Sequence, residues 1–214
     1  VDAAQATIEW IHRSAPDAVL EVQPLDLADL ASVRAAADAL VERHPRLDGL
    51  ANNAGIMAPP LGRTAQGFET QIGVNHLGHV SLTLGLLPAL LATPGARVVT
   101  VSSVGHRFGA IDLDDLVYAR RRYSRWRAYG QSKLANLLFT AELQRRFAAG
   151  GHDALALAAH PGFADTELGV GEIPGQRFAK ALIYPFLTHS AAAGAVPTLR
   201  ALTDPTAQGN DYFG

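Results

Sequence analysis

Hydrophobic residues along the chain occur in two alternating patterns. Helical spacing at residues 3–13, 30–43 and 125–147 predicts amphipathic helices. Compact apolar runs at 19–25, 47–51, 97–102 and 154–159 predict strands, and the β-branched run at 97–102 suits a strand buried on both faces. The alternation from end to end predicts an α/β fold, with a doubly wound, mostly parallel sheet.

Turn-forming residues and caps divide these elements. Asp29 can cap the helix that runs to about Arg43, and the prolines and glycine of residues 56–63 predict a loop. Helical spacing then covers residues 64–91, with Pro88 as a kink or break near the end. Residues 104–124 are expected to be irregular, and two more helical stretches are expected at 175–187 and 190–202.

Composition changes this interpretation little. A chain of 214 residues with 48% hydrophobic and 18% charged residues suits a single domain, 1–214, and no repeat or linker divides it. A net charge of -2 gives no reason to expect nucleic acid, and the absence of cysteine excludes a thiolate nucleophile or a Cys-type zinc site. The longest apolar run, residues 80–92, is too short to cross a bilayer. We therefore expect no transmembrane segment and a cytoplasmic location.

The most informative chemistry lies in Tyr129-Gly130-Gln131-Ser132-Lys133. Tyr129 and Lys133 are four residues apart, so they share a face of the predicted helix. A free tyrosine titrates near pH 10, and its use as an acid or base near neutral pH requires a shift of roughly 3 units. A lysine cation on the same face of a partly dry cleft could lower the tyrosine pKa.

Other short motifs accompany this pair in a fixed order. Asn52-Asn53-Ala54-Gly55, Asn75 and Val101-Ser102-Ser103 precede it, and Pro161-Gly162-Phe163-Ala164-Asp165-Thr166 follows it. In this arrangement the sequence resembles the short-chain dehydrogenase/reductase family, and the continuation Leu134-Ala135-Asn136 is most similar to its retinol-dehydrogenase-like branch. The resemblance implies a Rossmann-like fold and an NAD(P)-dependent oxidoreductase that interconverts a carbonyl and an alcohol.

The resemblance also assigns catalytic roles. Tyr129 would be the general acid/base, Lys133 would lower its pKa and bind the nicotinamide ribose, and Ser103 would hydrogen-bond the substrate oxygen. Asn75 would hold a water that links Lys133 to solvent. Ser102 and Ser103 face opposite ways on a strand, so only one can reach the site, and the family pattern favours Ser103.

The cofactor contacts implied by the family lie beyond the carboxyl ends of the strands, where ligands bind in open parallel sheets. NADP or NAD is expected, with NADP favoured by the resemblance. Gly55 lacks a side chain that would block close approach of the dinucleotide. The implied binding positions are Asp26, Leu27, Asn53, Ala54, Gly55, Tyr129, Lys133, Gly162, Ala164 and Thr166. Asp26, Ser103 and Asn53 could instead cap or turn the backbone.

Two departures from the family pattern leave alternatives open. Ser103 and Tyr129 are 26 residues apart, which fits an insertion that loops out over residues 104–124. No segment matches the Gly-rich turn that binds the pyrophosphate, so the resemblance implies further strands and a helix before Val1. A catalytically silent dinucleotide-binding or interaction module is therefore an alternative. Epimerisation or double-bond reduction on the same scaffold is a third.

Remaining features refine the expected partners. Apolar residues flank the predicted site and favour an apolar carbonyl or alcohol substrate: Phe108, Ile111, Leu113, Leu116, Phe163, Leu168, Ile183 and Phe186. The resemblance implies a homo-oligomer. His76 and His79 lack a third ligand, so no metal is expected. The arginine run at residues 120–127 is interpreted as a solvated helix start rather than a nucleic-acid patch.

Overall fold

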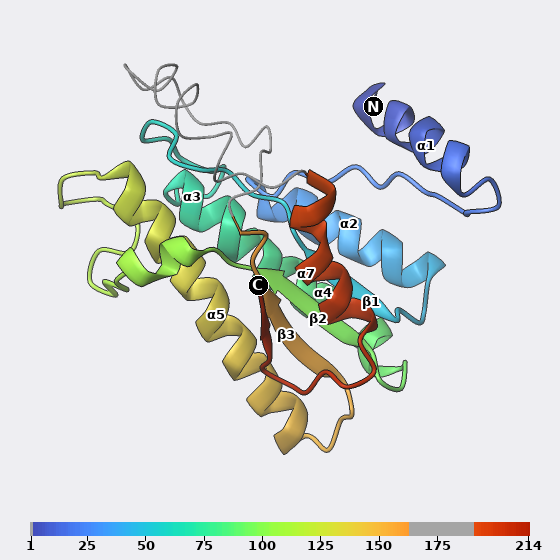
Figure 1. Ribbon diagram of the computed structural model, residues 1–214. Coiled ribbons are helices and arrows are strands. Elements are labelled where there is room, and N and C mark those ends of the chain that lie inside the picture. The colour runs from blue at the N-terminus through green and yellow to red at the C-terminus, as the bar shows by residue number, and fades with distance from the viewer. Residues whose placement is uncertain (1, 163–190) are drawn as a thin grey trace.

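The structure, a computed structural model, describes residues 2–162 and 191–214 and contains a four-stranded parallel sheet (Figure 1). The strands are β1 (Gly49–Asn52), β2 (Arg97–Val101), β3 (Leu155–Ala159) and β4 (Tyr212–Phe213), and they follow one another in this order across the sheet. In the register, Asn52 pairs with Thr100 and Val101 pairs with Ala159. The carboxyl ends of the strands therefore meet at one edge.

Helices cover both faces of this sheet, which confirms the predicted doubly wound α/β fold (Figure 1). On one face α4 (His79–Leu91) and α5 (Arg125–Ala149) pack on the strands, and α2 (Leu30–Arg43) packs on α4. On the other face α7 (Ala191–Thr203) contacts β1, β2 and β3. Asp29 caps α2 as expected, because its carboxylate accepts the N–H of Ala31.

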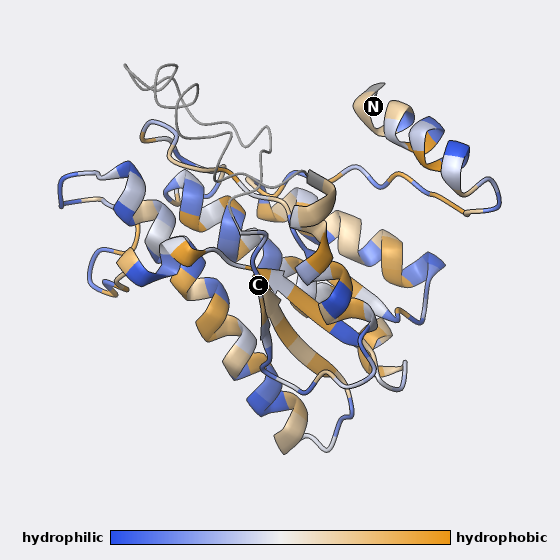
Figure 2. Cartoon of the chain, in the orientation of Figure 1, coloured by the Kyte–Doolittle hydropathy of each residue, from blue (hydrophilic) through white to orange (hydrophobic). Residues whose placement is uncertain are grey.

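Alternate residues of the central strands serve two separate hydrophobic cores. Val98 and Ala156 pack beneath α2, α4 and α5, whereas Val99 and Leu157 pack with Ala201 of α7. Figure 2 shows the strands as mainly hydrophobic between helices whose outer faces are more polar. Burial on both faces explains why these strands read as continuous apolar runs rather than as alternating ones.

The predicted long helix at residues 64–91 begins later than expected and changes character in its middle. Thr64 and Phe68 form a turn through two hydrogen bonds, and Glu69 then caps the helix by accepting the N–H groups of Gln71 and Ile72. The sequence continues as α3 (Thr70–Ile72), the π-helical segment η1 (Gly73–Gly78) and α4, which runs through Pro88 to Leu91. A π-helical turn inside an α-helix is frequently found at functional sites.

By length and composition, residues 70–91 form the one described helix that could cross a membrane. Two buried polar side chains of this segment, Asn75 and His79, lie in the protein interior, and Leu82, Leu86 and Leu90 belong to the hydrophobic core. The packing is that of a core helix, so we interpret the segment in this way.

The strand predicted at residues 19–25 is wrong. A strand needs a neighbour to receive its backbone hydrogen bonds, and no described strand lies beside this segment. Residues 19–25 are mostly exposed, and Val19 is 99% exposed. They form part of an extended connection from α1 (Asp2–Ser14), which lies apart from the sheet and its helices (Figure 1).

The remaining elements match the expected pattern closely. Residues 104–124 are irregular except for the 3-10 helix η2 (Val104–Phe108), and α5 begins directly after them at Arg125. The helix predicted at 190–202 is α7. The helix predicted at 175–187 lies outside the described residues.

Candidate active site at the carboxyl edge of the sheet

Two hydroxyl groups from different elements meet beyond the end of β2. Ser103 follows β2, and its side chain is hydrogen-bonded to Tyr129 in the second turn of α5. Gly105 makes this approach possible, because a Cβ there would lie 3.0 Å from Cε1 of Tyr129. Ser102 faces the other way and donates its hydroxyl proton to the Lys133 carbonyl oxygen at 2.8 Å. The structure thus places Ser103, and not Ser102, beside Tyr129.

Close packing between η2 and α5 fixes the separation of these hydroxyls. A Cβ on Gly130 would lie 2.8 Å from the carbonyl oxygen of Gly105 and 2.9 Å from the amide nitrogen of Gly109. Either contact is shorter than van der Waals packing allows, so only glycine fits at position 130. The glycine next to Tyr129 therefore lets the turn that follows Ser103 lie directly on the helix.

Lys133 lies below Tyr129 on the same face of α5 and is almost completely buried. The residue is 5% exposed, and Nζ donates a hydrogen bond to the Val101 carbonyl oxygen at 3.1 Å. Burial disfavours the charged ammonium and lowers the pKa of Lys133 to about 8. The Nζ atom is 5.8 Å from the centre of the Tyr129 ring.

The expected lowering of the Tyr129 pKa by Lys133 is not what this geometry gives. Burial of the phenol raises the Tyr129 pKa, and the hydrogen bond from Ser103 is the interaction that lowers it in part. The reason is that the Lys133 ammonium points at the Val101 carbonyl rather than at the phenol oxygen. Tyr129 is therefore held as the neutral phenol, a proton donor.

Asn75 lies at the centre of the π-helical segment and is fully buried. Its Nδ2 donates to the carbonyl oxygen of Ile56 at 2.9 Å and to Oγ of Ser132 at 3.0 Å, and its Oδ1 accepts the N–H of Ile56 at 2.8 Å. The side chain thus ties the loop after β1 to α5 one residue from Lys133. The expected role of Asn75 in holding a water stays a prediction.

The loop after β1 approaches the two buried residues closely enough to form part of a shared crevice. At Gly55 a Cβ would lie 3.2 Å from Oδ1 of Asn75 and 3.6 Å from Nζ of Lys133. The backbone of Gly55 therefore lies close to the Lys133 ammonium. Asn53 and Ala54 precede it and are exposed, so their polar groups are accessible to a ligand. The loop thus leaves exposed backbone groups close to the buried Lys133.

The remaining predicted cofactor residues lie around this loop or outside the described part of the chain. Leu27 is buried, and its carbonyl oxygen packs against Gly78, where a Cβ would be only 2.6 Å away. Asp26 is exposed, and its carboxylate accepts the N–H of Ala28, so it also turns the backbone. Gly162 follows β3 with φ of 66° and donates its N–H to Nδ1 of His160. Ala164 and Thr166 lie outside the described residues.

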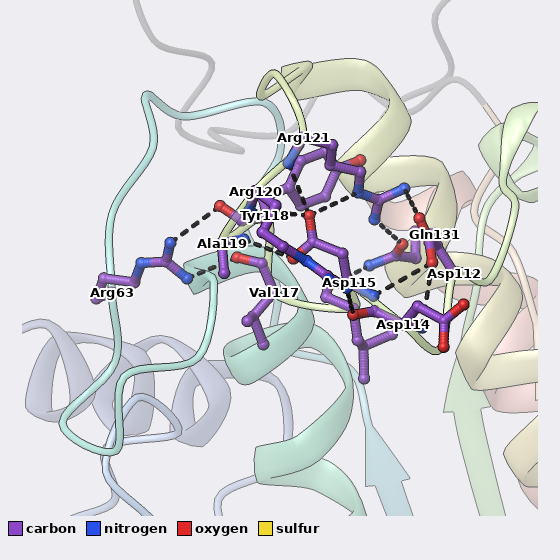
Figure 3. A network of polar contacts seen from close by, with 11 residues as sticks. Arg63, Asp112, Asp114, Asp115, Val117, Tyr118, Ala119, Arg120, Arg121 and Gln131 are labelled. Atoms are coloured by element: carbon purple, nitrogen blue, oxygen red, sulfur yellow. Dashed lines mark hydrogen bonds and ion pairs between the residues drawn. The ribbon is translucent and has the colours of Figure 1, made fainter.

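The irregular segment before α5 is organised by a buried carboxylate rather than left loose (Figure 3). Oδ1 of Asp115 accepts the N–H of Ala119, and Oδ2 accepts the N–H groups of Arg120 and Arg121. These charge-assisted hydrogen bonds lower the pKa of Asp115. The carboxylate therefore closes residues 115–121 into a compact turn.

Arg121 joins this turn to the helix that carries Tyr129. Its guanidinium lies 3.8 Å from the centre of the Tyr118 ring and donates to Oε1 of Gln131 at 2.6 Å (Figure 3). Gln131 in turn donates to the Leu116 carbonyl oxygen. Arg63 binds the carbonyl oxygens of residues 117 and 118 from the loop after β1. The expected insertion thus loops out from Ser103 and returns to α5 through defined contacts.

Replacing Asp115 by Ala should open the turn, since three backbone N–H groups lose their acceptor. We expect amide hydrogen exchange at residues 119–121 to accelerate about tenfold or more relative to the native protein. Asp114→Ala is the matched control, because the contacts of Asp114 in this network run through its backbone. Equal exchange rates in the two variants would rule out the role given to the Asp115 carboxylate.

The buried ammonium of Lys133 should cost stability in a pH-dependent way. Its pKa is about 8 in the folded protein and 10.5 ordinarily, a difference that corresponds to about 3 kcal/mol. The unfolded chain binds the extra proton between these values, so the cost is complete below about pH 8 and is relieved as the pH rises toward 10.5.

Lys133→Met should therefore be more stable than the native protein near neutral pH, by about 2 kcal/mol once the lost hydrogen bond to Val101 is subtracted. Urea unfolding of both proteins across this pH range measures the difference, which should shrink at the alkaline end. A difference that is constant with pH would show that Lys133 is not the titrating group.

Sequence patterns missed the pair of His76 and Asn136, which lies beside Lys133. His76 and Asn136 are hydrogen-bonded to each other at 3.1 Å, and Asn136 also binds the Val101 carbonyl that Lys133 contacts. The sequence suggests His76 only as a metal ligand, and within residues 2–162 and 191–214 no three His, Asp or Glu side chains gather as a metal site. The spacing of three between Lys133 and Asn136, which puts both on one helix face, was the available signal.

Known proteins with similar sequences include dehydrogenases. A family model described as short chain dehydrogenase matches residues 1–175. Retinol dehydrogenase 13 of Homo sapiens is 50% identical over 145 residues, which cover 68% of this chain and 43% of that protein. Polyprenol dehydrogenase of Mus musculus is 50% identical over 149 residues, which cover 68% of this chain and 44% of that protein. The chain thus spans less than half the length of these curated relatives.

Solved structures agree with this result. The crystal structure of an uncharacterized protein from Mycobacterium Paratuberculosis is 48% identical in sequence and has a TM-score of 0.72. The alignment covers 90% of this chain and 61% of that one. The likeness therefore extends from the sequence motifs to the arrangement of the sheet and its helices.

Proposed function

This chain belongs to the short-chain dehydrogenase family, and from this premise we propose that the protein interconverts a carbonyl and an alcohol by hydride transfer with NADP or NAD. One observation carries the proposal. The hydroxyls of Ser103 and Tyr129 are hydrogen-bonded to each other at the carboxyl edge of the sheet, with the buried Lys133 beneath them. The two hydroxyls come from different elements, the end of β2 and α5, and they meet at the edge of the sheet where ligands bind in this type of fold.

The pair of hydroxyls suits a substrate oxygen that gains or loses a proton. During carbonyl reduction, negative charge develops on that oxygen, and two preoriented O–H donors can stabilise it. Ser103 donates a hydrogen bond, and Tyr129 donates the proton that the product alcohol keeps. Tyr129 carries its proton near neutral pH, since its ordinary pKa is about 10 and burial raises it further.

A bound nicotinamide cofactor supplies or accepts the hydride, so the chain itself needs no redox-active group. We propose that Lys133 and Tyr129 contact the nicotinamide ribose. Asn53, Ala54 and Gly55 would line the adjoining part of the dinucleotide, with Asp26 and Leu27 toward the adenine. Gly162, Ala164 and Thr166 would flank the nicotinamide. The open backbone at Gly55, directly beside Lys133 and Asn75, supports the fit.

An apolar substrate is the best supported class. Relatives at 50% identity are named for retinol and polyprenol, which are long apolar alcohols. On η2 and the following segment, Phe108 and Leu113 are 77% and 84% exposed, and such side chains could receive an apolar chain. A homo-oligomer and a cytoplasmic location stay predictions.

Deuterium transfer tests this proposal. The full-length protein is incubated with an apolar aldehyde and NADPH or NADH that carries deuterium at the transferable position. We expect deuterium on the carbinol carbon of the alcohol product, together with oxidised cofactor. Deuterium at a carbon-carbon double bond, or epimerised product without net cofactor oxidation, would assign the site to another reaction. Cofactor binding without any turnover across a panel of aldehydes and ketones would favour a silent binding module.

A further inference from the structure

The carbonyl oxygen of Val101 accepts hydrogen bonds from two side chains of one helix. Lys133 Nζ and Asn136 Nδ2 each donate to it at 3.1 Å. The oxygen is available because β1 ends at Asn52, which pairs with Thr100, so the strand ladder on that side stops before Val101. Both residues are buried, with 5% exposure for Lys133 and 1% for Asn136. Lys133 thus shares its partner with a second donor.

The amide of Asn136 can adopt only one orientation in this arrangement. A carbonyl oxygen can only accept, so the group that faces Val101 must be the Nδ2 donor. The Oδ1 atom then faces His76, whose Nδ1 lies 3.1 Å away. Since Oδ1 also only accepts, Nδ1 of His76 must carry the proton.

His76 is well placed to hold this tautomer. It lies in the π-helical segment next to Asn75, and its ring packs edge-on against Phe139 with the ring centres 6.2 Å apart. Burial lowers the pKa of His76, so the ring is neutral near neutral pH and donates from one nitrogen. The chain of donors therefore runs from His76 to Asn136 to the Val101 carbonyl.

We propose that His76 and Asn136 are a positioning pair for Lys133: the N–H of His76 fixes the Asn136 amide, which shares the Val101 carbonyl with the lysine and so fixes where its ammonium points. The inference rests on the proposed function in one respect, since the positioned lysine is the one assigned to the cofactor ribose. The titratable groups near this lysine among the described residues are Tyr129 of α5 and His79 of α4.

Loss of the His76 donor has a defined consequence. Without it, the Asn136 amide keeps only its hydrogen bond to Val101, so its Nδ2 group is less firmly held and can move away from that carbonyl. The Val101 carbonyl oxygen would then accept from the Lys133 ammonium without a competing donor. Hydrogen bonds to the charged form favour it, so the lysine pKa should rise.

The test follows the titration of Lys133 directly. In protein with carbon-13 labelled lysine, NMR follows the titration of each lysine side chain, and Lys133→Met assigns the Lys133 signal. In the full-length protein, His76→Phe keeps an aromatic ring but removes the donor. We expect the Lys133 pKa to rise by at least about half a unit, and kcat of the reaction to fall about tenfold with KM little changed.

Three further variants make the result specific. His76→Asn carries an N–H at the same distance from the backbone as Nδ1, and it should restore the native titration and kcat. His76→Gln places its N–H one bond further out and should behave like His76→Phe, which keeps the test available if the Phe variant does not fold. Thr140→Val removes another buried polar group of α5, whose hydroxyl binds only the helix carbonyl of Asn136 among the described contacts, and should leave the lysine unshifted.

The outcomes separate the two proposals. A native Lys133 titration in His76→Phe and His76→Gln, or a shift in His76→Asn or Thr140→Val as large as theirs, would overturn the positioning role. The titration needs no turnover. If the Lys133 pKa shifts in the His76 variants but the native protein has no reductase activity, the positioning pair is supported and the proposed reaction is rejected. If the native protein turns over normally but the Lys133 pKa does not shift in these variants, the proposed reaction is supported and the positioning pair is rejected.

Discussion

Replacing Tyr129 by Phe in the full-length protein is expected to lower kcat by about 10²–10⁴-fold, the usual contribution of a positioned general acid or base. The variant loses the proton donor and the hydrogen bond to Ser103 but keeps the ring that packs against Gly105. Cofactor affinity should change little, because the phenol oxygen is one contact among several. Steady-state kinetics combined with cofactor titration by fluorescence measure the two effects separately.

Tyr123→Phe is the matched control for this experiment. Tyr123 is a second tyrosine with a hydrogen-bonded hydroxyl, whose partners are Glu69, Gln71 and the Pro59 carbonyl rather than Ser103. Its variant should lose some stability and keep its turnover number. If Tyr129→Phe retains kcat within about threefold of the native value, the acid/base assignment is wrong.

Replacing Asn75 by Leu is expected to cause the largest loss of stability. The side chain is fully buried, and its removal leaves the N–H and carbonyl of Ile56 without this partner. The Ser132 hydroxyl loses one hydrogen bond and keeps the one that it donates to the Tyr129 carbonyl oxygen. Each unsatisfied group costs about 1–3 kcal/mol, so the unfolding free energy should fall by about 3–5 kcal/mol. That is a large part of the stability of an ordinary domain, and urea unfolding measures it.

Asn53→Leu controls for the substitution itself, since Asn53 is exposed at the same edge of the sheet. We expect its unfolding free energy to lie within about 0.5 kcal/mol of the native value. Similar losses in both variants would show that the loop after β1, rather than the buried network around Asn75, limits stability.

Periodicity was sufficient for most of the fold, for reasons visible in individual elements. The strand β2 is buried on both faces, so its apolar run is continuous, and Asp29 has the side chain that an N-cap requires. Residues 19–25 have a similar apolar content but no strand. Their conformation depends on a neighbouring strand, and a property of a neighbour is absent from the local sequence.

The candidate site, like the fold, was predicted only in part from the sequence. The motif spacing predicted which groups come together, and Ser103 does face Tyr129. Motifs did not predict that Lys133 points at the Val101 carbonyl, or that burial raises the Tyr129 pKa. Lys133 points at Val101 because that carbonyl oxygen lies beyond the end of β1 and lacks a strand partner there. The Tyr129 pKa rises because the packing of α5 buries the phenol.

By itself, the sequence determined the α/β fold class, the family resemblance and the candidate site side chains, because these follow from local periodicity and from residue types at fixed spacing. Tertiary structure alone decided the orientation of Lys133, the tautomer of His76 and the closure of residues 115–121 on Asp115. The physical reason is that a hydrogen-bond partner or a buried environment comes from residues distant in the chain, and its strength depends on geometry that no local pattern encodes.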